Sequence, residues 1–276
     1  MIMVINKTIT MKKTVLLLAI LLILFLGVFN LTMINFVNNN HEVVIIEQEK
    51  KEDKITLDIK IINFGGINCY LVKTDTGYIL IDTGYPAKRT DLEKELESAG
   101  CKPGDLKLVV LTHGDHDHAG NCAYLQDKYG TKIAMHADDS GMVERGDMGW
   151  NRKAKPDKIS IMFRIMPLIS FFSRPGKFDI FKPDIYVEDG QGLSEYGFDA
   201  KVLYIPGHSK GSIGILTTGG DLFCGDLLYN FYKPGFVYYI NDLADYNASI
   251  EKLKSLKINT VYPGHGKPFP MSSFTK

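Results

Sequence analysis

Residues 106–118 read Leu-Lys-Leu-Val-Val-Leu-Thr-His-Gly-Asp-His-Asp-His and form the most informative motif of the chain. Its first half is a mostly apolar run typical of a buried strand, and its second half holds five ionisable side chains in six positions. Histidine and aspartate are metal ligands, and a strand end brings such side chains to one edge of a sheet. The stretch therefore predicts a metal site at the end of a central strand.

Three further segments repeat this arrangement later in the chain. Each places a histidine or an aspartate beside glycine directly after a β-like apolar run: residues 206–208 (Pro-Gly-His), 225–226 (Gly-Asp) and 263–266 (Pro-Gly-His-Gly). A single histidine is most simply structural, but packing does not readily explain four such clusters. Glycine lets the backbone turn tightly and frees the next side chain to face a common point. Imidazole and carboxylate bind zinc, iron or manganese, and no Cys-x-x-Cys pair suggests a thiolate site.

The remaining pattern alternates strands and helices in two similar halves. Strands are predicted at 55–62, 68–73, 78–81, 106–111, 132–135, 185–187, 200–205, 213–216, 222–223 and 258–262, and helices at 88–99, 119–129 and 243–256. We expect an α/β fold with two sheets between helices. Residues 141–183 fit this rhythm poorly and are interpreted as a helical insertion packed on the domain, with a lid or a bilayer-contacting surface as the alternative.

The N-terminal segment is membrane-directed. Residues 15–29 contain no charged or polar side chain and follow Lys12 and Lys13. A helix continued to residue 37 reaches about 34 Å, enough for the ~30 Å hydrocarbon core. We expect a single-pass anchor, with a cleaved signal peptide as the alternative. The lysines would stay cytoplasmic, so the rest of the chain would lie outside the cytoplasm or be secreted.

Composition narrows the function classes. The 276 residues are 45% hydrophobic, and 32 basic side chains balance 32 acidic ones. This is a globular composition, and zero net charge removes the broad attraction on which nucleic-acid binders depend. We therefore expect a small-molecule substrate and no nucleic-acid partner, and the sequence leaves the oligomeric state open.

Taken together, the motifs resemble the metallo-β-lactamase fold superfamily, whose signature is His-x-His-x-Asp-His followed by three further ligands. The resemblance covers residues 55–268 and includes the early Asp-Thr-Gly turn at 82–84. It implies a four-layer αββα sandwich. The expected organisation is a membrane segment at 1–40, a linker at 41–54 and a catalytic domain at 55–276.

The resemblance also implies two divalent metal ions, with zinc favoured and iron or manganese as alternatives. The implied ligands are His113, Asp115 and His208 for the first ion, Asp117, His118 and His265 for the second, and Asp226 between them. Residue 115 departs from the pattern, because the superfamily usually has its second histidine there. We expect Asp115 to ligate in its place, with His116 as the alternative, and the extra carboxylate makes the ligand set harder.

The resemblance implies a hydrolase that uses a metal-bound hydroxide to cleave a small ester, thioester, lactone or lactam. Asp117 is the candidate catalytic residue, because its carboxylate could orient the hydroxide or carry its proton to the leaving group. A diiron oxidoreductase and a phosphodiesterase or nuclease of the same fold are the alternatives. A glyoxalase-type thioesterase is disfavoured, because that group carries a further C-terminal helical region.

Overall fold

The computed structural model describes residues 57–159, 179–237 and 239–274. The predicted membrane segment, the linker and residues 160–178 of the predicted insertion lie outside the described residues. Within these three described ranges, none of the helices has the length and apolarity needed to cross a bilayer.

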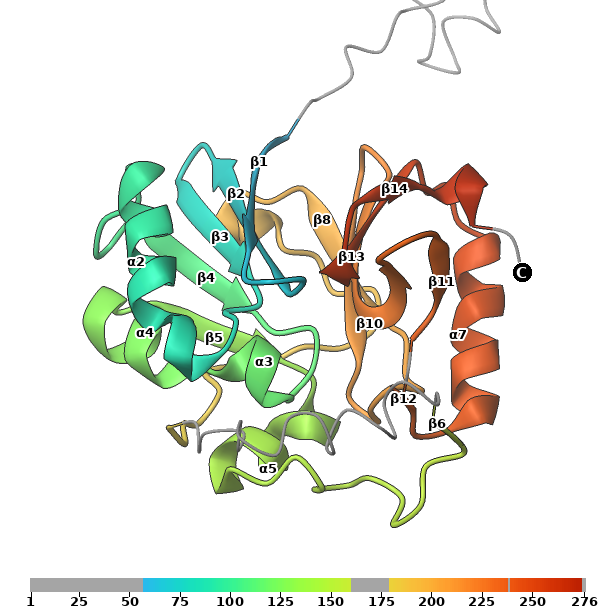
Figure 1. The fold of residues 1–276 in the computed structure, drawn as a ribbon. Coiled ribbons are helices and arrows are strands. Elements are labelled where there is room, and N and C mark those ends of the chain that lie inside the picture. Colours follow the sequence, from blue (N-terminus) through green and yellow to red (C-terminus); the bar gives the residue numbers. More distant parts are fainter. Residues whose placement is uncertain (1–56, 160–178, 238, 275–276) are drawn as a thin grey trace, which may run out of the picture. The chain divides into compact units, whose positions relative to one another are not determined.

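The first sheet has six strands in the order β1-β2-β3-β4-β5-β7 (Figure 1). Strands β1 to β3 pair antiparallel, and β3, β4, β5 and β7 run parallel. The strands are β1 Asp58–Asn63, β2 Asn68–Thr74, β3 Gly77–Ile81, β4 Leu106–Val110, β5 Lys132–Met135 and β7 Ile185–Tyr186. Parallel neighbours require crossover connections, and helices α2 (Arg89–Ser98) and α4 (Cys122–Tyr129) supply two of them.

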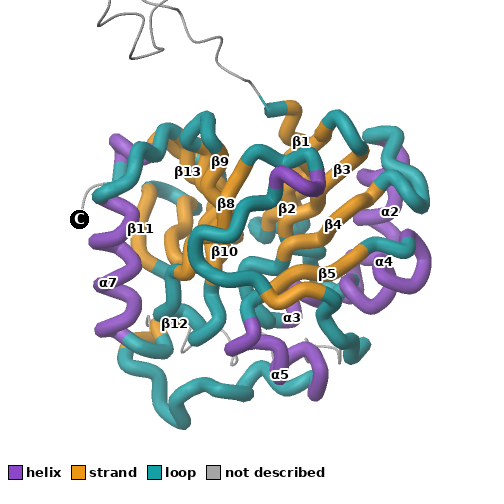
Figure 2. Tube along the Cα trace, turned by 180° about the vertical axis from the view of Figure 1, so that it is seen from behind, coloured by secondary structure: helices purple, strands orange, loops and turns teal. Residues whose placement is uncertain are grey.

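The second sheet has the order β14-β13-β10-β9-β8, with β11 also paired to β10. Strands β10 and β13 run parallel, and the other pairs are antiparallel, so both sheets are mixed. The strands are β8 Ala200–Tyr204, β9 Ile213–Thr217, β10 Asp221–Asn230, β11 Pro234–Phe236, β13 Thr260–Gly266 and β14 Phe269–Pro270. Helix α7 (Leu243–Lys254) lies along this sheet in both views (Figures 1 and 2).

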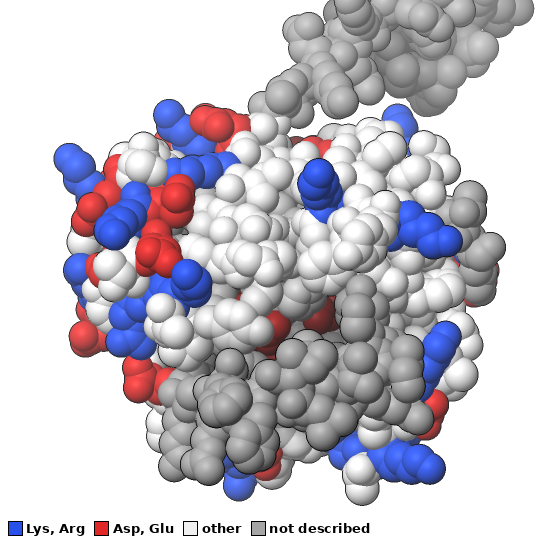
Figure 3. All heavy atoms as spheres, in the orientation of Figure 1, with Lys and Arg blue, Asp and Glu red and all other residues white. Residues whose placement is uncertain are grey.

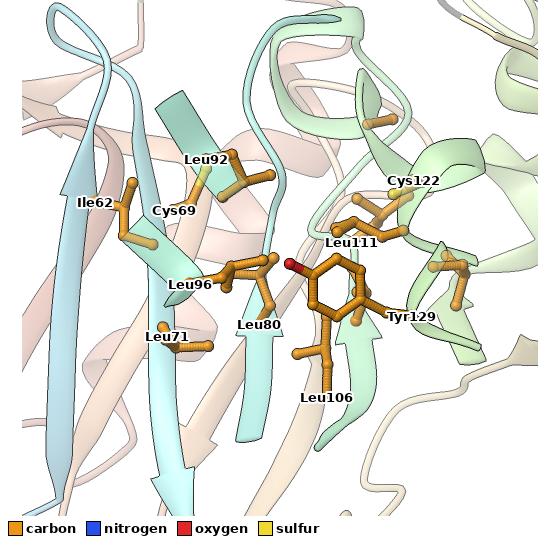
Figure 4. Packing of buried hydrophobic residues seen from close by; sticks show 14 of the residues in the cluster. Ile62, Cys69, Leu71, Leu80, Leu92, Leu96, Leu106, Leu111, Cys122 and Tyr129 are labelled. Atoms are coloured by element: carbon orange, nitrogen blue, oxygen red, sulfur yellow. The ribbon is translucent and has the colours of Figure 1, made fainter. Parts of the chain in front are cut away.

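Three buried clusters hold the layers together. The first joins the outer face of the first sheet to α2 and α4, as the packing of Leu80 against Leu96 illustrates (Figure 4). The second lies between the sheets and includes Val110 and Ile215, and the third joins the second sheet to α7 through Ile250. The prediction of two sheets between helices is therefore confirmed, and burial of apolar side chains on both faces of each sheet is what stabilises it.

Most of the predicted elements are present, although β13 is shifted from the predicted 258–262 to Thr260–Gly266 and the short strands β6, β11, β12 and β14 were not predicted. Three further differences are instructive. The predicted helix at 119–129 is two helices, α3 (His116–Ala119) and α4, which Gly120 and Asn121 separate. Strand β10 is longer than expected and includes Asp226. The predicted insertion begins inside a helix, α5 (Ala137–Arg145), which the sequence pattern did not indicate.

The remaining described elements are short. Strands β6 and β12 form a separate two-stranded sheet. Their bounds and those of the 3₁₀ helices are β6 Lys158–Ile159, β12 Tyr239–Ile240, η1 Pro86–Lys88, η2 Ser194–Tyr196 and η3 Met271–Ser273.

Candidate metal centre

The four predicted clusters converge where the two sheets meet. Strand β4 leads into His113, the chain after β8 leads into His208, and β10 and β13 carry Asp226 and His265 themselves. A backbone hydrogen bond of 2.8 Å from the Ile213 amide to the Thr112 carbonyl ties the two sheets together beside the site. Residues as far apart in the chain as His113 and His265, which are 152 positions apart, thus meet at one point.

Three sets of side chains could each hold a metal ion, with ligand atoms within 4.8 Å of one another. Two of them do not share a residue, and we name them the first group (His113, Asp115, His208) and the second group (Asp117, His118, His265). The third set contains His113, His118 and Asp226, and it connects the two groups. All seven predicted ligands therefore belong to these sets. Their assignment to individual ions stays a prediction.

Asp226 lies between the groups. Its Oδ1 is 3.3 Å from His118 Nε2, and its Oδ2 is 3.2 Å from His265 Nε2 and 3.8 Å from His208 Nε2. Asp117 lies on the second group's side, with its Oδ2 3.5 Å from His265 Nε2 and 3.8 Å from His118 Nε2. The carboxylate oxygens and the imidazole Nε2 atoms therefore face a common space.

The donor atoms fit divalent cations. His113 Nε2, His118 Nε2 and Asp226 Oδ1 are buried and have no hydrogen-bond partner among the described residues. Buried polar atoms rarely remain unpaired, because each such atom costs about 1 to 3 kcal/mol. Unpaired nitrogen and oxygen atoms that converge in this way match the ligand chemistry of zinc, iron or manganese.

Glycine at two positions lets the backbone approach this closely. At Gly264 a Cβ atom would lie 2.5 Å from Asp226 Oδ1 and 2.7 Å from His118 Cε1, so any side chain there would fill the space between the ligands. Gly207 has φ +134° and packs against the backbone of Tyr246, which only glycine accommodates. The glycines beside the histidines thus have the role predicted from the sequence.

Asp82 supports the second group from behind. It is 2% exposed, and its Oδ2 lies 2.8 Å from His118 Nδ1. The same carboxylate accepts hydrogen bonds of 2.8 Å from the Thr112 amide and hydroxyl. A carboxylate against Nδ1 fixes the orientation of the ring and leaves Nε2 free to bind a metal. The sequence identified residue 82 only as part of a turn, not as this support.

Asp139 supports the first group in a different way. This fully buried carboxylate on α5 accepts hydrogen bonds from Ser209 Oγ at 2.5 Å, the Gly211 amide at 2.7 Å and the Gly114 amide at 3.2 Å. It therefore joins the loop after His113 to the loop after His208. Neither Asp139 nor Ser209 is among the site residues predicted from the sequence.

Residues 115 and 116 have different surroundings. Asp115 Oδ2 lies 3.1 Å from His208 Nε2 and 3.5 Å from His113 Nε2. His116 instead has its Nδ1 3.0 Å from Met148 Sδ, and its ring lies 5.0 Å from that of Tyr85. His116 belongs to none of the metal-binding sets formed by the described residues. The geometry thus favours Asp115 as the ligand.

Arg152 also contacts Asp115 and is not among the site residues predicted from the sequence. Its Nη2 lies 2.9 Å from Asp115 Oδ1 and 3.0 Å from Oδ2, and its side chain is 11% exposed. Burial acts to raise the pKa of Asp115, but the charge of Arg152 and the adjacent imidazoles of His113 and His208 outweigh it and hold that pKa well below its usual value.

Charged neighbours also outweigh the effect of burial on the pKa values of Asp226 and of His118 in the second group. Burial acts to raise the pKa of Asp226, but His265 and His118 outweigh it and hold that pKa well below its usual value. Burial acts to lower the pKa of His118, and Asp226, Asp82 and Asp117 together raise it well above its usual value. These neighbours favour the ionised form of Asp226, which is the form that binds a metal.

The view in Figure 3 shows how charge is distributed on one face. Basic and acidic side chains mix over α2, while the middle of this face is largely uncharged apart from acidic atoms within a recess. The four cysteines are buried and unpaired, so none forms a disulfide with another.

Comparison with known proteins identifies relatives of the chain. It is 26% identical to the Beta-lactamase-like protein 2 homolog of Drosophila melanogaster over 73% of the chain, but spans only 59% of that protein's length. It is 30% identical to the Hydroxyacylglutathione hydrolase GloC of Haemophilus influenzae, over 59% of the chain and 66% of the relative. It is 25% identical to the Acyl-coenzyme A thioesterase MBLAC2 of Bos taurus, over 73% of the chain and 74% of the relative.

These relatives weigh against one expectation. The sequence disfavoured a glyoxalase-type thioesterase, yet a hydroxyacylglutathione hydrolase is among the relatives.

A similar solved structure and a family model lead to the same superfamily as these relatives. BJP-1, a subclass B3 metallo-beta-lactamase of Bradyrhizobium japonicum, matches with a TM-score of 0.56 at 23% identity, over 76% of this chain and 75% of that one. The family model described as Metallo-beta-lactamase superfamily matches residues 62–265, which include every predicted ligand. The chain belongs to the metallo-β-lactamase superfamily.

Proposed function

We propose that the chain is a metal-dependent hydrolase of small thioesters, with esters, lactones and lactams as less favoured substrates. One observation carries the proposal: buried Nε2 and carboxylate atoms converge without hydrogen-bond partners of their own. The names of two relatives, a hydroxyacylglutathione hydrolase and an acyl-coenzyme A thioesterase, support the choice of thioesters.

The residues of the two groups would hold two divalent cations. His113, Asp115 and His208 would hold one ion, Asp117, His118 and His265 the other, and Asp226 both. When bound, such ions supply an acidified water and polarise the substrate carbonyl. The chain's contribution is to fix the ligands in place, with Asp82 behind His118 and Asp139 beneath the His113 and His208 loops.

Asp117 would move the proton. Its carboxylate is partly accessible, with 16% of its side chain exposed, and lies beside His118 and His265. In thioester hydrolysis, a bond forms between the water oxygen and the acyl carbon and the carbon–sulfur bond breaks. Asp117 would accept the proton released by the water and deliver it to the sulfur of the departing thiolate.

The test is metal analysis of the purified full-length chain together with a substrate panel. We expect two divalent ions per chain and release of free thiol from acyl-coenzyme A or acylglutathione thioesters. The metal-stripped protein should be inactive and should recover activity with zinc or manganese. Bound iron with oxygen consumption and no hydrolysis would contradict the proposal and favour the diiron oxidoreductase alternative.

The Asp117→Asn variant separates the two roles of that residue. Turnover should fall by about 100-fold or more, the usual size of a general acid–base contribution, while metal content falls much less. Equal losses of turnover and metal would leave Asp117 as a ligand only.

We also propose that residues 15–37 anchor the protein in the cell membrane with the catalytic domain outside the cytoplasm. The uncharged stretch after Lys12 and Lys13 supports this proposal. The full-length chain should remain in the membrane fraction after a high-salt wash, and protease added outside the cell should digest its catalytic domain. Recovery of a shortened chain in the medium would instead indicate a cleaved signal peptide.

A further inference from the structure

Arg152 is a buried cation placed directly against the first group. It follows α5 in the chain, and its side chain is 11% exposed. Its Cζ lies 5.2 Å from the centre of the Tyr239 ring, and its Nε is buried without a hydrogen-bond partner among the described residues. Burying an arginine is unfavourable unless it has an ionic partner, and here Asp115 is that partner.

Arg152 and the histidines share one oxygen atom. Asp115 Oδ2 lies 3.0 Å from Arg152 Nη2, 3.1 Å from His208 Nε2 and 3.5 Å from His113 Nε2. An ion held by the two histidines would draw on this same oxygen. The guanidinium therefore both orients the carboxylate toward the histidines and withdraws part of its charge from any ion bound there.

The second group has no such partner. In the described part of the chain, the ion pairs of Asp117 and Asp226 are formed with histidines alone. The positive charge of Arg152 thus acts on one side of the site. A buried cation repels a divalent ion strongly, because the surroundings screen it far less than water does.

We propose that Arg152 is a positioning residue that holds Asp115 toward His113 and His208 and weakens cation binding at the first group, so that the second group fills first. This inference rests on the proposed function. It also gives the substitution at residue 115 a physical meaning: an aspartate paired with an arginine carries the same net charge as the neutral imidazole that usually stands there.

The test is calorimetric titration of the metal-stripped full-length chain with Zn²⁺. The unmodified chain should show two binding events of different affinity. Arg152→Gln removes the charge and should tighten the weaker event by about tenfold or more, which is the Coulomb effect of one unit charge on a nearby divalent ion even in a water-like dielectric. Arg152→Met, which keeps the length of the stem without its charge, should act in the same direction and serves if the glutamine variant does not fold.

Three controls assign the effect to charge at the first group. Arg152→Lys restores the positive charge and should stay near the affinity of the unmodified chain. Arg145→Gln should leave both events unchanged, because Arg145 stacks on Trp150 with its Cζ 4.1 Å from the ring centre and contacts no ligand. In a His208→Ala background, which disables the first group, Arg152→Gln should have no effect on the remaining event.

The outcomes separate this inference from the proposed function. A weaker event that is unchanged or weakened further in both neutral variants would overturn the role of Arg152 alone. Failure of the unmodified chain to bind any divalent cation would overturn the proposed function, and this inference with it.

Discussion

The two groups of the metal centre are built from similar side chains but supported in different ways. The second group is backed by the buried carboxylate of Asp82, which lies directly against His118 Nδ1. In the first group, by contrast, His113 Nδ1 lies 3.0 Å from the Thr112 hydroxyl and His208 Nδ1 lies 2.9 Å from a backbone carbonyl oxygen. A negative charge therefore faces the Nδ1 atom of His118, whereas the Nδ1 atoms of His113 and His208 face neutral groups.

This difference extends to the ligands themselves. The second group follows the superfamily pattern, whereas the first contains Asp115 in place of a histidine and has Arg152 against it. A carboxylate adds negative charge to a site, and the adjacent guanidinium offsets it. The substitution at residue 115 is thus understood only together with Arg152, which compensates it. Variants of the shared and supporting residues test this difference between the two groups.

The largest effect is expected where the two groups meet. Asp226→Ala removes the one carboxylate that lies between them, so both groups should lose metal affinity and hydrolysis should fall by about 1,000-fold or more. Metal content and kcat/KM would measure this. Asp221→Ala on the same strand should change neither, and an Asp226 variant with normal metal content would remove the residue from the centre.

The next largest effect is expected at Asp139, which supports the first group. Asp139→Ala leaves two buried amides and the Ser209 hydroxyl without their acceptor, which should lower the free energy of unfolding by about 3 to 5 kcal/mol. Urea denaturation monitored by circular dichroism would measure the loss. The neighbouring Asp138→Ala is the matched control, because its side chain makes only a 3.4 Å contact with Tyr204 and a 3.8 Å contact with His136 Nδ1 in the described part of the chain, and its loss should cost less than about 1 kcal/mol. Equal losses would show that Asp139 has no special role.

The sequence indicated which side chains come together in the candidate metal centre, because each of them follows a recognisable local pattern. An apolar run predicts the strand, a glycine predicts the turn, and the next histidine or aspartate lies at the strand end, as at Gly207 and His208. These signals extend over only a few positions. Several of these local signals together are enough to indicate the fold without any information on long-range contacts.

The supporting residues could not be found in this way. Asp139 lies 70 positions from Ser209, and Arg152 lies 37 positions from Asp115, so no local pattern connects either pair. Helix α5 was missed for a related reason. Gly141 in its middle disfavours a helix by about 1 kcal/mol, but a Cβ atom there would lie 2.2 Å from the Trp150 indole. A tertiary contact therefore decides the residue at this position, and local propensity does not reveal it.

A smaller effect should distinguish the carboxylate behind the second group. Asp82→Asn keeps the shape but removes the negative charge that faces His118 Nδ1, so metal affinity at the second group should fall by about 10- to 100-fold. Titration with Zn²⁺ would show the loss in the tighter binding event. The exposed Asp75→Asn in the turn after β2 is the control and should leave affinity unchanged. A loss confined to the weaker event would contradict the separate support of the two groups.

The smallest effect is expected at His116, and it tests which residue replaces the missing histidine. His116→Ala should leave Zn²⁺ affinity within about twofold of the unmodified chain, because its Nδ1 faces Met148 Sδ and its ring packs near Tyr85. Asp115→Ala, by contrast, deletes an oxygen that lies within 3.5 Å of both His113 and His208, so the weaker event should disappear.

Measuring the two neighbours side by side controls for disturbance of the loop, since each variant shortens a side chain of the same short segment. Loss of the weaker event in the His116 variant and its survival in the Asp115 variant would reverse the assignment. The compensating arginine would then balance a carboxylate that binds no metal.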